Sequence, residues 1–202
     1  MNKFIFLCLL TVSFILPSAS SGETIPNTVK SYRKLLTRIP NTKAGMLQLA
    51  TLFVTEGVNK MALTKVIVPG TAEYTAFFKY KEIAEYAKKY YDAQWKKWNK
   101  NDPGIDPGME KTNIKIYSAT VKDIVNHTGK LWVHFTLLSK GMWPYIKEKY
   151  IIYKCYYKKP GKKYGFRISG FTHVNGRWTI FPKMKRVLRI IPKKILNKYR
   201  SR

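Results

Sequence analysis

The stretch YGFRISGFTHVNGRWTIFP, residues 164–182, decides the fold of this chain. In its middle, the pair Asn175-Gly176 separates two runs that are rich in aromatic and β-branched residues. Both residues of a tight type I′ turn need a positive φ, which asparagine and glycine accept more readily than other residues. The pattern therefore predicts a β-hairpin with its turn at Asn175-Gly176.

This turn fixes which residues of the hairpin face one another. The expected cross-strand pairs are Val174 with Arg177, His173 with Trp178, Thr172 with Thr179, Phe171 with Ile180, and Gly170 with Phe181. Because side chains alternate along a strand, the hairpin has two faces. One face carries Phe171, His173, Trp178 and Ile180, and the other carries Thr172, Val174, Arg177 and Thr179. We expect the first, more apolar face to lie against the core.

The N-terminus has the three parts of a secretory signal peptide. Residues 1–3 include a lysine, residues 4–16 are mainly apolar, and residues 17–22 are mostly small. We expect a signal peptide over residues 1–20, cleaved after Ser20, and an exported protein that is periplasmic or extracellular. An uncleaved membrane anchor is the alternative, but the apolar run is shorter than the roughly 20 residues that a spanning helix needs.

Removal of the signal peptide takes away Cys8 and leaves Cys155 without a partner for an intramolecular disulfide. The neighbours of Cys155, YIIYKCYYKK, are mostly apolar or aromatic, which favours a buried, inert cysteine in a strand. Pairing with another chain is the alternative.

Positive charge is the most extreme bulk property of the chain. It contains 38 Lys and Arg against 11 Asp and Glu, a net charge of +27, and removal of Lys3 with the signal peptide leaves 37 − 11 = +26. Such a charge attracts polyanions, anionic lipid surfaces and acidic proteins. A lysine-rich proteome with solvated surfaces would give the same excess, so the sequence leaves both interpretations open.

The first half of the mature chain has helical periodicity. Residues 28–39 predict a short helix that ends before Pro40, and residues 44–68 predict two short helices on either side of Glu56-Gly57. Residues 71–100 predict one long helix with an aromatic stripe, which we interpret as packing surface rather than a cofactor site. The stripe consists of Phe77, Tyr80, Ala84, Ala87, Tyr91, Trp95 and Trp98.

Two Asp-Pro-Gly triplets, at residues 102–104 and 106–108, follow this helix. Their acids do not have the spacing of a calcium-binding loop, so we interpret them as turns. The three histidines, His127, His134 and His173, fall on separate elements and give no metal-ligand pattern. We therefore expect no metal and no cofactor.

From residue 111 onward the apolar pattern has period two, which is typical of strands. Strands are expected over residues 113–124, 130–139 and 149–158 and in the two arms of the hairpin. Short turns between them predict an antiparallel meander. The fold class is thus α+β, with N-terminal helices packed on a curved antiparallel sheet of about five to six strands. Asn126 begins a glycosylation sequon on a predicted turn, which has an effect only in a eukaryotic secretory pathway.

The domain organisation follows from these elements. We expect a signal peptide (1–20), a polar N-terminal segment with a short helix (21–43), an α+β cone-like domain (44–188) and a basic C-terminal tail (189–202).

Two stretches carry a resemblance to a known superfamily. LATLFVTEGVNKMALTKVIVPG, residues 49–70, and FTHVNGRWTIFPKM, residues 171–184, resemble the helical part and the closing strand pair of nuclear transport factor 2-like proteins, also called SnoaL-like or cystatin-like cones. The resemblance covers about residues 44–187. It implies helices packed into the concave side of a curved sheet and a pocket at the wide end.

Enzymes of that superfamily generally aim a carboxylate into the cone, often beside a histidine or tyrosine. The sheet half of this chain offers Glu110, Asp123 and Glu148, and none of them alternates with the apolar face. We therefore name no catalytic residue and expect a binding protein rather than an enzyme. A binding pocket lined by Phe171, His173, Trp178 and Ile180 is one hypothesis; a packed core histidine beside Trp178 is the other.

The C-terminal segment, residues 183–202, combines basic and apolar residues and contains no acid. Its cations are Lys183, Lys185, Arg186, Arg189, Lys193, Lys194, Lys198, Arg200 and Arg202. A basic amphipathic tail suits an anionic membrane surface or a polyanion, although its apolar residues would equally serve to cover the open end of the domain.

We thus predict an exported, non-enzymatic binding protein that engages an anionic surface, a polyanion or an acidic protein. The alternative is a small-molecule carrier or enzyme with a pocket near His173. No specific nucleic acid is expected, because no recognition motif accompanies the charge. A homodimer is left open.

Overall fold

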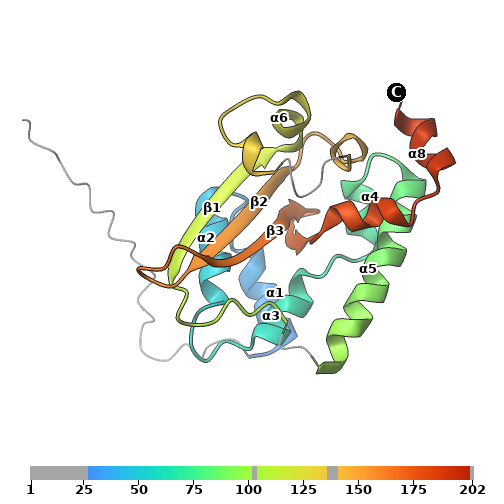
Figure 1. Ribbon diagram of the computed structural model, residues 1–202. Helices are drawn as coiled ribbons and strands as arrows, with labels where there is room; N and C mark the ends of the chain where they lie inside the picture. Colours follow the sequence, from blue (N-terminus) through green and yellow to red (C-terminus); the bar gives the residue numbers. More distant parts are fainter. Residues whose placement is uncertain (1–26, 102–103, 136–140, 201–202) are drawn as a thin grey trace, which may run out of the picture.

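The computed structural model describes residues 27–101, 104–135 and 141–200. The predicted signal peptide lies outside these residues. Among them, no helix combines the length and apolarity needed to cross a membrane. Helices come first along the chain and the sheet second, so the predicted α+β class is confirmed (Figure 1). The helices are α1 (Val29–Thr37), α2 (Lys43–Leu52), α3 (Lys60–Ile67), α4 (Thr71–Phe77), α5 (Lys81–Asn101), α6 (Val121–Asn126) and α8 (Lys193–Arg200). Three 3₁₀ turns are η1 (Trp132–His134), η2 (Trp143–Tyr145) and η3 (Met184–Arg189).

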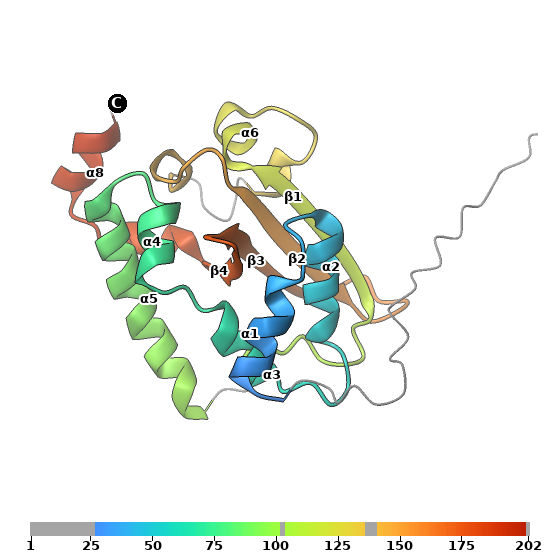
Figure 2. The same cartoon turned by 180° about the vertical axis from the view of Figure 1, so that it is seen from behind.

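The sheet has four antiparallel strands in the order β1-β2-β3-β4. They are β1 (Asn113–Thr120), β2 (Ile151–Lys158), β3 (Gly165–Val174) and β4 (Arg177–Ile180). Helix α2 packs on β1, while α1 and α3 pack on β4, so these three helices cover one face of the sheet (Figure 2). The long helix α5 lies to the side, next to α4.

The first three helices begin where the sequence offers capping residues. The side chains of Thr28, Thr42 and Asn59 accept hydrogen bonds from backbone N–H groups of the first turn, over 3.2, 3.0 and 2.9 Å. Such caps satisfy donors that have no partner within the helix. The helix expected over residues 28–39 and the two expected around Glu56-Gly57 are therefore confirmed.

The single helix expected over residues 71–100 is wrong. The chain leaves the helix at Phe78, which has an extended ψ of 145° and forms an isolated β-bridge with Ile146. Backbone bonds from Lys79 N–H to the Tyr145 carbonyl (2.8 Å) and from Lys147 N–H to the Phe77 carbonyl (3.0 Å) hold this break. Neighbouring residues on a helix point about 100° apart. The break allows Phe77 and Phe78 both to be buried.

The aromatic stripe does form packing surface, as predicted. Phe77, Ala84, Ala87, Tyr91 and Trp95 are buried and Tyr80 is half-buried. Phe181, from the end of the hairpin, stacks on Phe77 with ring centroids 4.3 Å apart. The side chain of Trp98 lies outside the described part of the chain.

Two strand predictions are wrong in part. The strand expected over residues 113–124 ends at Thr120, whose side chain accepts a hydrogen bond from Asp123 N–H over 3.0 Å and caps α6. The strand expected over residues 130–139 is absent from residues 130–135, which form η1, and its remainder lies outside the described residues. Strand β1 consequently pairs directly with β2. In the part of the chain that the structure describes the sheet has four strands, so the expected five to six are not confirmed.

The opening hairpin has the predicted turn and register. Four of the five expected pairs, from Val174 with Arg177 to Phe171 with Ile180, belong to the β3–β4 ladder. At the fifth, Phe181 N–H donates to the Gly170 carbonyl over 2.9 Å. The turn residue Asn175 has a φ of +51°. The predicted turn chemistry is therefore confirmed.

Both faces of the hairpin are covered, although only one was expected to be. Thr172, Val174 and Thr179 are buried as fully as the apolar face. The Thr179 hydroxyl donates to the Ile67 carbonyl over 3.0 Å, where the end of α3 contacts the edge strand β4. In β2, Cys155 is a free, buried cysteine, as predicted.

Candidate functional site

The four residues of the predicted pocket lie together on the hairpin, and three of them are core. Phe171, Trp178 and Ile180 have no exposed surface. The Trp178 indole N–H donates to the Ile39 carbonyl over 3.0 Å, which ties the hairpin to the end of α1. His173 is half-buried, with its ring edge-on to Trp178, and partial burial lowers its pKa. This arrangement places His173 at the rim of a filled core.

The acidic residues of the sheet half have local structural partners. Asp123 accepts hydrogen bonds from the hydroxyls of Thr120 (2.6 Å) and Thr128 (3.1 Å), and these bonds lower its pKa. Glu148 and Glu110 pair with Lys79 (3.0 Å) and Lys111 (2.6 Å). Within the described ranges, none of these three carboxylates forms a hydrogen bond or an ion pair with a histidine side chain.

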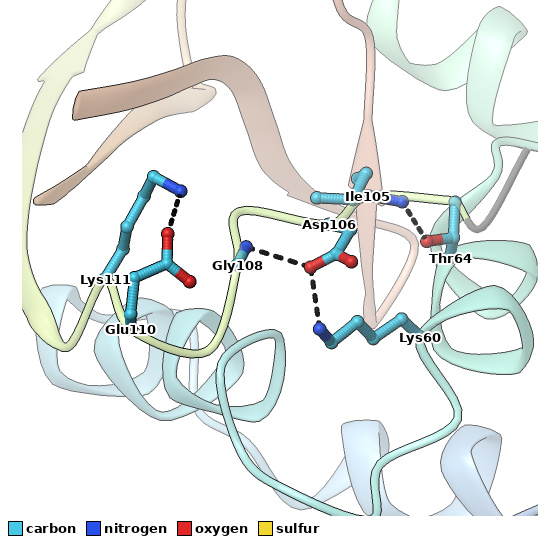
Figure 3. A network of polar contacts seen from close by, with 7 residues as sticks. All are labelled: Lys60, Thr64, Ile105, Asp106, Gly108, Glu110 and Lys111. Carbon is cyan, nitrogen blue, oxygen red and sulfur yellow. Dashed lines mark hydrogen bonds and ion pairs between the residues drawn. The ribbon is translucent and has the colours of Figure 1, made fainter. Parts of the chain in front are cut away.

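The loop of the second Asp-Pro-Gly triplet is held by a lysine (Figure 3). Asp106 accepts hydrogen bonds from Lys60 Nζ over 2.6 Å and from Gly108 N–H over 2.9 Å. Nearby, Ile105 N–H donates to the Thr64 hydroxyl over 2.9 Å. Within the described ranges, no group of three or more metal-binding side chains occurs. The bond to Lys60 lowers the pKa of Asp106, which favours its charged form.

Sequence reasoning missed one buried acid, Glu73. This residue is 6% exposed, accepts a hydrogen bond from Gly70 N–H over 2.6 Å, and lies 3.8 Å from Arg177 of β4. Arg177 also donates to the carbonyls of Val66 (2.8 Å) and Val68 (2.7 Å) at the end of α3. The spacing of Glu73 three residues after Gly70 is a signal for a helix start. Its pairing with Arg177 depends on the tertiary fold.

No protein-family model, curated protein or solved structure matches this chain. Its charge distribution and surface shape are therefore the observations from which a function is inferred.

The basic C-terminal segment packs against the domain and leaves its cations on the outside. Met184, Val187 and Ile191 are buried, and η3 lies against α5. Tyr199 stacks on Tyr80 with ring centroids 3.9 Å apart. Lys183, Lys185, Arg186, Arg189, Lys193, Lys194 and Lys198 are exposed, while the side chains of Arg200 and Arg202 lie outside the described part of the chain. Pro192 separates η3 from α8.

Positive and negative charges are segregated along the chain and in space. No acidic residue follows Glu148 in the sequence, although lysines and arginines continue to the end. Ion pairs in the described ranges engage Glu73, Glu82, Asp92, Asp106, Glu110 and Glu148. Within the C-terminal segment, as far as the structure describes it, only Lys198 forms an ion pair, with Glu82 over 3.1 Å. Most of its cations thus face solvent without a counter-charge.

A shallow hollow of about 620 Å³ lies between α2 and the edge strand β1. Its lining is mainly apolar, with a lysine on each element, and consists of Lys43, Ala44, Leu47, Ile114, Lys115, Ile116, Tyr117 and Leu131. The predicted pocket residues around His173 are not part of it.

Proposed function

We propose that this protein binds a negatively charged surface or polymer and has no catalytic role. The observation that supports this proposal is the segregation of charge. Most acids form ion pairs, while strands β1 to β3 and the C-terminal segment expose cations and contain no acid. Fixed clusters of one sign raise the local concentration of an oppositely charged partner and speed its association. Export, the fold resemblance and a homodimer remain parts of the proposal that need their own experiments.

The test is binding of the mature chain to three anionic probes: heparin, polyphosphate and vesicles that contain phosphatidylglycerol. We expect binding to at least one probe at low salt, with affinity that falls steeply as ionic strength rises through the physiological range. Neutral phosphatidylcholine vesicles are the control. If none of the anionic probes binds at low salt, the proposed function is wrong.

The contribution of the C-terminal segment is better tested by neutralisation than by deletion. A deletion would remove Met184, Val187 and Ile191 from the core and so disturb the fold. Replacement of exposed Lys185, Arg189 and Lys193 by glutamine removes three charges and leaves these contacts in place.

A second candidate function, transport of a small amphiphilic molecule, is favoured by the hollow between α2 and β1. An apolar lining with one lysine from each wall suits a hydrocarbon group attached to an anionic head. Titration with an environment-sensitive fluorescent fatty acid tests this function, and Leu47→Trp, which fills the hollow, should abolish the signal. A signal that Leu47→Trp leaves unchanged would remove the support for this candidate.

A further inference from the structure

The outer face of the sheet carries a cluster of cations around one aromatic ring. The strand register places Tyr156 of β2 between Lys115 of β1 and Arg167 of β3. Lys158, two residues further along β2, lies on the same face because side chains alternate. Strands are spaced about 4.8 Å apart, so Lys115 and Arg167 are separated by about 10 Å across the sheet. We call Lys115, Tyr156, Lys158 and Arg167 the outer sheet face.

This face is open to solvent. Helices α1, α2 and α3 lie behind the sheet as seen in Figure 1, while β1, β2 and β3 face the viewer. Lys115 and Arg167 are exposed, and Tyr156 and Lys158 are half-buried. At the far end of the same face, Lys154 donates to the His134 carbonyl over 3.0 Å and Tyr117 contacts the His134 ring, so η1 covers that end only.

The cations of the outer sheet face have no acidic partner. Strands β1, β2 and β3 and the turn between β2 and β3 contain no Asp or Glu. The turn adds Lys159, Lys162 and Lys163, all exposed. Partial burial and, to a lesser degree, the neighbouring charge of Arg167 lower the pKa of Lys154. An anion placed here would relieve the repulsion between these groups.

Two further observations narrow the class of anion. The face offers no aliphatic side chain near Tyr156 for insertion into a bilayer. The outward residues around this ring are Asn113, Lys115, Tyr117, Lys154, Lys158, Arg167 and Ser169. The Tyr156 ring is already contacted by Arg167 (5.4 Å) and Lys158 (5.8 Å), and the Tyr117 ring by His134. Single-stranded nucleic acids gain much of their affinity by stacking bases on free aromatic rings. The rings of Tyr156 and Tyr117 already have such contacts within the protein, with cations and with His134.

We infer that the outer sheet face, with the lysines of the β2–β3 turn, binds a linear sulfated polysaccharide through its sulfate groups. The planar guanidinium of Arg167 can donate two parallel hydrogen bonds to one sulfate group. The lysines supply further positive charges along the length of the polysaccharide. This inference rests on the proposed function, which it deepens by naming the ligand and the surface.

The experiment compares three variants that each lose three positive charges. The test variant is Lys115→Gln/Lys158→Gln/Arg167→Gln on the outer sheet face. The control is Lys30→Gln/Lys34→Gln/Lys65→Gln on the exposed sides of α1 and α3. The third variant, Lys185→Gln/Arg189→Gln/Lys193→Gln, measures the separate contribution of the C-terminal segment. Binding of a heparin octasaccharide is measured by calorimetry over a range of salt concentrations, with desulfated heparin as the ligand control.

We expect the test variant to bind heparin about tenfold or more weakly than the wild type. The slope of log affinity against log salt concentration should become shallower by about one unit for each contact that is removed. The control variant on α1 and α3 should lose less than about threefold, because it removes only distant charge, and the C-terminal variant should lose less affinity than the test variant. Desulfated heparin should bind weakly to all proteins. Equal losses in the three variants would overturn the assignment of the face, while leaving general anion binding intact.

Two additional measurements keep the inference testable whatever the stability of the variants. On the wild-type protein, bound heparin should protect Lys115, Lys158 and the turn lysines from acetylation, and leave Lys30, Lys34 and Lys65 reactive. An oligothymidylate of matched charge and phosphatidylglycerol vesicles are run alongside. Tighter binding of either one, or protection of Lys30, Lys34 and Lys65 in place of the face, would overturn the polysaccharide inference. Failure of the wild type to bind any anionic probe would instead overturn the proposed function itself.

Discussion

Tyr199 of α8 donates a hydrogen bond from its hydroxyl to Glu82 Oε2 of α5 over 2.9 Å. The same carboxylate pairs with Lys198, and the Tyr199 ring stacks on Tyr80. These contacts fasten the basic end of the chain to the helical part of the domain. Helix α8 is therefore presented as a fixed surface, and the Tyr145 hydroxyl adds a hydrogen bond to the Leu196 carbonyl over 3.3 Å.

We predict that Tyr199→Ala releases α8 without unfolding the domain. Hydrogen exchange in residues 193–200 should become faster, while exchange in β2 and β3 stays as in the wild type, because α8 contributes only half-buried apolar side chains to the core. Lys194→Gln, an exposed cation in the same helix, is the control and should leave exchange unchanged. Unaltered protection of α8 in Tyr199→Ala would show that other contacts hold it.

The attachment of α8 should also depend on pH. Hydrogen bonds from Lys198 and Tyr199 lower the pKa of Glu82 below its ordinary value of 4.5. A carboxyl group whose pKa is lower in the folded protein than in the unfolded chain stabilises the folded protein when the pH is above its ordinary pKa. This stabilisation is lost as the pH falls through the pKa of the group in the folded protein. We expect exchange in α8 to accelerate below about pH 4.5 in the wild type. In Glu82→Gln, exchange should be fast already at neutral pH and should change less on acidification.

Arg177 should be one of the most important polar residues for stability. It supplies two hydrogen bonds to carbonyls at the end of α3 and lies beside the buried carboxylate of Glu73. Hydrogen bonds from a charged donor contribute about 1.5–3 kcal/mol, and their loss leaves acceptors unsatisfied. We expect Arg177→Met to lower the free energy of unfolding by about 2–4 kcal/mol in urea denaturation. Arg186→Met, on an exposed arginine of η3, should change it by less than about 0.5 kcal/mol.

Trp178 couples the hairpin to the first helix through both its ring and its indole N–H. Trp178→Phe keeps most of the apolar volume and loses the bond to the Ile39 carbonyl, so we expect a loss of about 1–3 kcal/mol. Trp178→Ala also opens a cavity beside Tyr153 and should cost about 3–5 kcal/mol. Chemical denaturation followed by circular dichroism measures both. Similar stabilities for the two variants would contradict the packing role of the ring.

His173 should make the stability of the domain sensitive to mild acid. Partial burial lowers its pKa from the ordinary 6.5, so the unfolded chain takes up a proton at a higher pH than the folded protein. The contribution of neutral His173 to the free energy of unfolding is consequently present above about pH 6.5. It is lost as the pH falls toward the pKa of His173 in the folded protein. We expect His173→Gln to flatten the change in melting temperature between pH 7.5 and pH 5.5. Parallel curves for wild type and variant would contradict this role.

The hairpin, the first three helices and the fold class follow from the sequence, because each depends on local chemistry. Asn175-Gly176 selects its turn by accepting a positive φ, and the helical periodicity of residues 28–39 and 44–68 predicts the first three helices. The buried Cys155 and the aromatic stripe of α5 also follow from residue pattern. The charge excess is a property of composition, and it needs no structure to predict attraction to anions.

Tertiary contacts decided the remainder. The break at Phe78 depends on a bridge to Ile146, which lies far away in the sequence, and residues 130–135 form a 3₁₀ turn in place of an expected strand. The pairing of Arg177 with the end of α3 and the alignment of Lys115, Tyr156 and Arg167 in one row likewise join distant segments. Periodicity along a chain records which side chains are buried. Tertiary packing determines which segments become neighbours. It also determines whether a cation forms an ion pair with an acid or is exposed to solvent.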